Sequence, residues 1–179
     1  MSIADFWLPI LVASAFTFVA GAVIWMAMPW HKSDYRKTGD EESVRAALKG
    51  CVPGLYNVPH AASNADYQSE DMQQKMQDGP NAFVTVMPSG VPGMGPKLVR
   101  NFLYNLLVAA LCAYMLTMTQ AETYLDIYRV TCTTAWIAYG VAYIQESIWF
   151  GRPWTLTLKN LFDALLYGLL IGGVFGWLA

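Results

Sequence analysis

Charged residues are scarce in this sequence. They make up 13% of its 179 residues, whereas a soluble globular chain has about a quarter. The formal net charge is −2, so no basic excess predicts binding to nucleic acid. Hydrophobic residues make up 55% and lie in long blocks toward both ends of the chain, with most of the charge between them. This distribution predicts a helical protein of the lipid bilayer.

Histidine and cysteine are also scarce, which excludes several kinds of metal and haem site. His31 and His60 lie outside the apolar blocks, so no pair of histidines can ligate a haem inside them. Cys51, Cys112 and Cys132 are too far apart to form a CxxC unit. His31, His60 and Cys51 together lack the short spacing of zinc ligands. We therefore expect no cofactor.

The common catalytic and phosphate-binding motifs are absent as well. The sequence contains no GxSxG or HExxH motif. Its glycine-rich stretch at residues 90–95 lacks the GK[ST] ending of a phosphate-binding loop, and we predict no strand–helix context around it. No class of enzyme is therefore indicated, and we expect a protein that is not an enzyme.

Four apolar blocks are each long enough for a transmembrane helix, which needs roughly 20 residues to cross the hydrocarbon core. They cover residues 6–30, 101–118, 124–149 and 161–178. No Lys or Arg precedes the first block, which is also longer than the core of a signal peptide, so we expect it to remain as a span. The sequence thus predicts an all-α membrane protein, with residues 1–179 forming a single membrane domain.

Residues 31–97 form a 67-residue loop between the first two predicted spans. Two short helices are predicted within it, over residues 40–49 and 69–78, because each starts with a good capping side chain and is followed by glycine. Prolines and glycine at residues 52–60 predict turns. The stretch at 88–96 holds three prolines and three glycines, and we expect it to be irregular.

Basic residues predict the orientation in the membrane, because Lys and Arg are enriched in cytoplasmic loops. With four spans, residues 31–100 and 151–160 lie on one side. That side holds ten of the eleven basic residues: Lys32, Arg36, Lys37, Arg45, Lys49, Lys75, Lys97, Arg100, Arg152 and Lys159. We therefore expect a cytoplasmic loop and two periplasmic termini.

Four ionisable residues lie within the predicted spans and are candidates for an intramembrane polar network: Asp126, Arg129, Glu146 and Asp163. Asp126 and Arg129 share a helix face near the outer end of their span, where we expect a local ion pair. Glu146 and Asp163 lie about one turn from the inner ends of the last two spans and are placed to meet across that hairpin. This inner pair serves either as a relay for a proton or ion or as an interfacial fastening.

The last span also carries a row of glycines at a spacing of four residues: Gly168, Gly172 and Gly176. Such rows let two helix backbones come close together in lipid. The partner is either another span of the same chain or a helix of a second protein. Within the chain, the row formed by Ala13, Thr17 and Gly21 on the first span is the expected mate.

Three segments together resemble a group of small bacterial integral-membrane proteins of unknown function: GLYNVPH at residues 54–60, MPSGVPGMG at 87–95 and FDALLYG at 162–168. The similarity runs through most of residues 50–179. The resemblance implies a multi-pass protein of the bacterial inner membrane. It implies no activity and no catalytic residue.

Three functions remain open at this point, and one of them is a membrane enzyme or metal site at the cytoplasmic loop. The glycine row and the lack of a catalytic set favour a non-enzymatic accessory or assembly subunit that acts through helix–helix contacts with a membrane-protein partner or a second copy. The alternative is a small transporter or channel that uses Glu146 and Asp163. Four spans leave little room for a solute path in one protomer, so this alternative predicts a homo-oligomer.

Overall fold

The computed structural model describes residues 2–91 and 93–179. The protein is mostly helical, at 71% of its residues. It divides into two compact units, one formed by residues 1–35 and 93–179 and the other by residues 36–92. That both belong to one membrane domain stays a prediction, and each unit is described by itself below.

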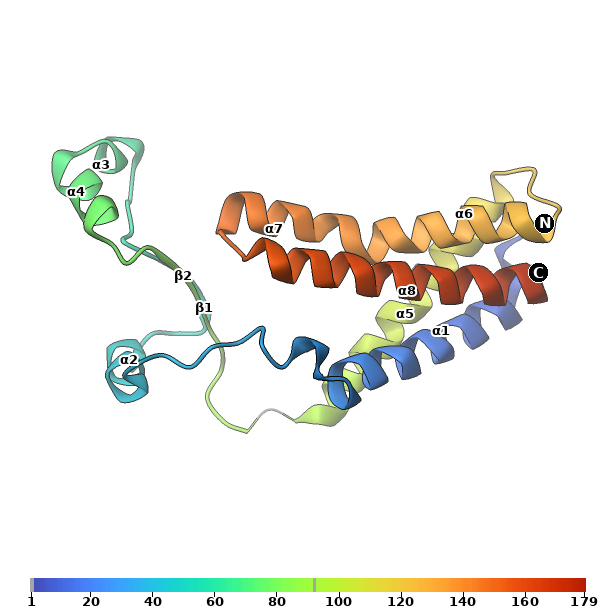
Figure 1. Cartoon of the computed structure of the whole chain (residues 1–179), viewed down its shortest axis with the longest axis horizontal. Coiled ribbons are helices and arrows are strands. Elements are labelled where there is room, and N and C mark those ends of the chain that lie inside the picture. The colour runs from blue at the N-terminus through green and yellow to red at the C-terminus, as the bar shows by residue number, and fades with distance from the viewer. Residues whose placement is uncertain (1, 92) are drawn as a thin grey trace. The chain divides into compact units, whose positions relative to one another are not determined.

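The first unit is a bundle of long helices (Figure 1). Its elements are η1 (Ile3–Phe6), α1 (Trp7–Ala22), η2 (Val23–Ala27), η3 (Pro29–His31), α5 (Met94–Thr117), α6 (Tyr124–Trp136), η4 (Ile137–Val141), α7 (Ala142–Phe150) and α8 (Trp154–Leu178). Helix α1 packs on α5 and α8, and α6 packs on the same two neighbours. The start of η1, the connection from α5 to α6 and the end of α8 lie at the same end of the bundle (Figure 1).

Three helices of the bundle are long and apolar enough to span a membrane: Ile3–Ala27, Met94–Thr117 and Trp154–Leu178. By class, the chain is therefore a helical membrane protein. Helices α5 and α8 begin at residues 94 and 154, earlier than the predicted 101 and 161, because helical hydrogen bonding continues through polar residues that hydropathy excludes from a span. The fourth predicted span, residues 124–149, is helical through α6, η4 and α7 but is not one of these three.

The glycine row of α8 faces α6. A Cβ atom added to Gly168 lies 2.8 Å from the backbone oxygen of Cys132, and one added to Gly176 lies 2.8 Å from Cε2 of Tyr124. At Gly172 the added Cβ lies 3.0 Å from Cβ of Cys132. Only glycine leaves room for so close an approach of the two helices.

The first span is not the mate of this row. The glycines meet side chains and backbone of α6, and Gly21 of α1 instead faces the Tyr167 ring, with 3.4 Å between an added Cβ and the hydroxyl oxygen. The expectation that Ala13, Thr17 and Gly21 form the mate is therefore wrong. Spacing identified a close helix contact, but it contains no information about which helix makes it.

The second unit consists of α2 (Glu41–Leu48), β1 (Gly54–Val58), α3 (Asn64–Tyr67), α4 (Glu70–Asp78) and β2 (Ala82–Val86). Both predicted helices are confirmed with their caps, because the Asp40 carboxylate accepts from the Ser43 N–H at 3.1 Å and the Ser69 hydroxyl accepts from the Met72 N–H at 3.3 Å. Hydrogen bonds from Ser43 also lower the pKa of Asp40. Gly79 ends α4 at a φ of +62°.

The prediction of turns over residues 52–60 is wrong in part. Residues 54–58 form β1, which pairs antiparallel with β2 from Gly54 opposite Val86 to Val58 opposite Ala82. A strand whose partner lies far along the chain cannot be found from local turn residues alone. The predicted irregular stretch also ends early, because α5 begins at Met94 and Pro96 fits its first turn.

The contact between α6 and α8 can be tested with a matched pair of glycines. Gly168→Ala places a methyl group against a backbone oxygen, and overpacking of this kind costs about 1–3 kcal/mol. Gly173→Ala adds the same methyl where nothing lies within 4 Å. We expect Gly168→Ala to lower the thermal unfolding temperature of the purified protein in mild detergent by several degrees, and Gly173→Ala to leave it unchanged or raise it. Equal effects of the two variants would contradict this helix contact.

Candidate functional site

A buried histidine lies where the first span ends. The segment leaves the π-helical turn η2, turns at Pro29 and places His31 in the 3₁₀ turn η3 with 6% of its surface exposed. Its imidazole ring stacks on the Trp25 ring, with 3.8 Å between the ring centroids and an angle of 2° between the planes. This contact fixes the plane of the ring, and the two ring nitrogens point outward from different edges of that plane.

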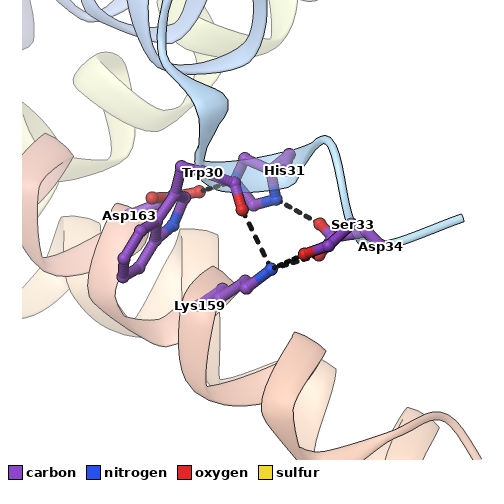
Figure 2. Close-up of polar contacts among 6 residues, drawn as sticks. All are labelled: Trp30, His31, Ser33, Asp34, Lys159 and Asp163. Atoms are coloured by element: carbon purple, nitrogen blue, oxygen red, sulfur yellow. Dashed lines mark hydrogen bonds and ion pairs between the residues drawn. The ribbon is translucent and has the colours of Figure 1, made fainter.

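Each nitrogen of His31 meets a carboxylate (Figure 2). Nε2 lies 2.7 Å from Oδ2 of Asp163 on α8, and Nδ1 is hydrogen-bonded to Oδ2 of Asp34 three residues further along. The side chains of Asp34 and Asp163 are only 3% and 5% exposed. An ionised carboxylate can only accept a hydrogen bond, and a neutral imidazole has a single N–H to donate. A neutral imidazole can therefore donate to only one of the two carboxylates. For both contacts to be hydrogen bonds, the group of three side chains must hold one additional proton.

Lys159 completes the cluster from the preceding turn of α8. Its Nζ lies 2.5 Å from Oδ1 of Asp34, and it also donates to the Trp30 carbonyl at 2.9 Å and to the Ser33 hydroxyl at 3.2 Å (Figure 2). Burial raises the pKa of Asp34, but hydrogen bonds from Lys159 and His31 outweigh it and hold that pKa below its usual value. Asp34 is thus ionised at neutral pH, and the other carboxylate that faces the imidazole is Asp163.

The cluster does not have the geometry of a metal site. The two carboxylates lie on opposite sides of the imidazole ring, so their oxygens do not converge on one point with a free ring nitrogen. Within residues 2–91 and 93–179, no three His, Cys, Asp or Glu side chains are arranged to hold a metal ion. The positive charge that faces Asp34 comes from Lys159.

Asp163 also lines a pocket of about 440 Å³ between helices of the bundle, which is open to the outside at exposed lining residues such as Met26 and Met94. The wall comes from α1, η2, α5, η4, α7 and α8, and its polar members are Thr17, Asn101, Tyr104, Asn105, Tyr139, Tyr143, Asn160, Asp163 and Tyr167. Both π-helical turns contribute, since η2 supplies Trp25 and η4 supplies Tyr139. Such turns are often found at functional sites, because the extra residue changes where neighbouring side chains point.

The tyrosines of the wall are held in place. The Tyr139 hydroxyl donates to Oδ1 of Asn105 at 2.8 Å, and the Tyr104 hydroxyl donates to the Ala138 carbonyl at 3.2 Å. The Tyr104 and Tyr139 rings meet edge to face with 5.4 Å between centroids, and the Tyr139 and Tyr167 rings do so with 5.3 Å. The aromatic wall is therefore preorganised for a ligand and does not need to be ordered by it.

The four residues of the predicted intramembrane network are not brought together. Glu146 pairs with Arg152, with 3.2 Å between Oε2 and Nε, and both side chains are about half exposed. Asp126 accepts from the Thr123 hydroxyl at the start of α6. In the part of the chain that the structure describes, Arg129 forms no ion pair with Asp126, and Asp163 does not meet Glu146.

Sequence reasoning selected Asp163 but missed its partners. His31 and Asp34 lie just past the first span, in a segment that we assigned to the loop. One signal was present: Lys159 and Asp163 are four residues apart and so share a face of α8. Nothing in the sequence indicates that this face meets a residue more than a hundred positions away.

Comparison with protein-family models, with curated proteins and with solved structures found no match. The class to which the chain belongs, a helical membrane protein, therefore rests on its three apolar helices. The site rests on the geometry described above.

The cluster predicts that replacing Lys159 destabilises the protein much more than replacing Arg152. Lys159→Met removes the cation from the buried Asp34, and hydrogen bonds to charged groups are worth about 1.5–3 kcal/mol. Arg152→Met removes the partner of the half-exposed Glu146, and such pairs contribute about 0–1 kcal/mol. We expect Lys159→Met to lower the unfolding temperature in detergent at pH 7 by several degrees more than Arg152→Met does.

The sign of the pH dependence provides a control. Because the pKa of Asp34 is lowered on folding, its stabilisation is complete above its ordinary pKa of about 3.9 and is lost as the pH falls through the folded value. The difference between the native protein and Lys159→Met should therefore shrink below about pH 4. A difference that grows on acidification would contradict the assigned pairing.

Proposed function

We propose that this chain is a proton-linked transporter of a small solute in the bacterial inner membrane. The observation that carries the proposal is the double role of Asp163, which forms part of the cavity wall and is at the same time bonded to His31. A solute in the cavity and a proton on the histidine therefore act on the same carboxylate. A group that both ligands contact couples their binding directly, because each ligand changes the free energy of binding the other.

The other predicted function loses its main support. A non-enzymatic accessory or assembly subunit was inferred from the glycine row, and this row packs against α6 of the same chain. It therefore offers no free helix face to a partner. Within the transporter alternative, Asp163 keeps its predicted role, whereas Glu146 lies outside the cavity wall and pairs with Arg152. We assign the second position to His31.

The charged and titratable groups around His31 and Asp163 influence whether this pair holds a proton. Asp34 is hydrogen-bonded to the imidazole, Lys159 of α8 is bonded to Asp34, and Tyr167 lies four residues after Asp163 on the same helix. Trp25, which covers the ring from η2, does not titrate. With a proton on His31 the charges of His31, Asp34, Lys159 and Asp163 sum to zero, and without it they sum to −1. Loss of the proton is therefore favoured when a positive charge enters beside Asp163.

The proposed orientation has residues 124–149 as a fourth span, residues 31–97 in the cytoplasm, and both termini in the periplasm. It is supported by the position of ten of the eleven basic residues on one side and by the common end of the bundle at which η1 begins and α8 ends (Figure 1).

We expect alkaline phosphatase fused to either terminus to be active in a bacterial host, and green fluorescent protein fused there by the same route to stay dark. Fluorescence at one terminus only would exclude a fourth span.

Protonation of His31 can be measured through its stacked indole, because an imidazolium in contact with a tryptophan ring quenches its fluorescence. We expect the fluorescence of the purified protein to change with pH with the steepness of a single proton. His31→Gln should abolish this transition.

Two tryptophan variants control this measurement. Trp25→Phe should remove the transition, whereas Trp177→Phe, which changes an exposed ring near the end of α8, should leave it intact. A transition that survives His31→Gln would rule out His31 as the proton carrier and with it the proposed linkage.

A further inference from the structure

The charge of the cavity wall indicates the kind of solute that it accepts. Asp163 is the one carboxylate among the lining residues, and no lysine, arginine or histidine is found with it in the described part of the chain. The neighbouring amides of Asn101, Asn105 and Asn160 each offer a carbonyl oxygen. A low-dielectric site lined in this way attracts a cation and repels an anion.

Aromatic rings make up much of the remaining wall: Phe18, Trp25, Tyr104, Tyr139, Tyr143 and Tyr167. The faces of such rings carry negative charge density and attract cations within about 6 Å of the ring centre. The hydroxyls of Tyr104 and Tyr139 are already bonded to protein acceptors, so these residues have their rings to offer a ligand. A carboxylate surrounded by aromatic rings suits a cation that is itself partly apolar.

A bare metal ion fits this site poorly. Calcium takes six to eight oxygen ligands and magnesium keeps several waters, whereas the wall is mainly aromatic and aliphatic. The volume of about 440 Å³ lies in the range of pockets that hold small organic molecules. Size and lining therefore agree on an organic ligand.

We propose that the cavity binds a small organic cation of the quaternary ammonium type and that its binding releases the proton held by His31 and Asp163. This inference rests on the proposed function, for which it names the class of substrate. When the ammonium group pairs with Asp163, His31 keeps its Nδ1–H bond to Asp34 and gives up its Nε2 proton to water. One positive charge enters and one leaves, so the charge of the cluster and its ligand is unchanged.

Choline provides a direct test on the purified full-length protein in detergent, because its charge is fixed and it has no ammonium proton of its own to release. Its neutral isostere 3,3-dimethylbutan-1-ol has the same shape without the charge. We expect saturable quenching of tryptophan fluorescence by choline at pH 7 and binding of the alcohol that is at least ten times weaker. Equal binding of the two compounds would overturn the cation assignment and leave the proton site untouched.

Proton release is measured by isothermal titration calorimetry in two buffers of different ionisation enthalpy. We expect close to one proton released per choline bound to the native protein. Choline binding without proton release would refute the exchange. The pH transition of His31 described above is recorded on the same sample, so that failure of the substrate class is distinguished from failure of the proton site.

Three variants locate the effect. Asp163→Asn keeps the shape of the side chain and should weaken choline binding at least tenfold, whereas Glu146→Gln, which neutralises a carboxylate outside the wall, should not change it. His31→Gln retains Asp163 and should bind choline without releasing a proton. Choline affinity that is unchanged in a folded Asp163→Asn protein, or proton release that persists in His31→Gln, would overturn the inference.

Discussion

The contact of His31 with two buried carboxylates is the interaction on which the rest of the site depends. It ties the segment after the first span to α8 across 132 residues of sequence. Taking ionised groups out of water is costly unless they are paired and hydrogen-bonded, and here each charge has a partner of opposite sign. The same contact holds Asp163 at the wall of the cavity, so that the fold at this point and the chemistry of the cavity share one residue.

The helices of the bundle meet in two different ways. Along the glycine row, α6 and α8 approach so closely that even a methyl group has no room. Elsewhere, large aromatic and amide side chains of α1, α5 and α8 surround the cavity. The π-helical turns η2 and η4 belong to this second region, where they break the regular register of their helices and turn Trp25 and Tyr139 toward the cavity. Helix α8 thus packs tightly against α6 along its glycine row and lines the cavity with other residues.

Local rules predicted a good part of the fold. Asp40 and Ser69 cap helices as expected, since a cap depends only on residues three positions away. The strand β1 was missed because its partner begins more than twenty residues later. For the site, the sequence indicated Asp163 but paired it with Glu146. Equal depth in the membrane suggested that pairing, and depth alone does not specify which helix faces are opposed.

The sequence by itself determined that this chain contains membrane-spanning helices. A long apolar run in lipid must satisfy its own backbone hydrogen bonds, and a helix does so within the segment. Only the tertiary structure decided which polar side chains meet. Those pairings depend on the rotation of each helix about its axis and on the path of the segment after η2. Both are set by contacts between residues far apart in the chain, such as Gly168 with Cys132 and Asp163 with His31.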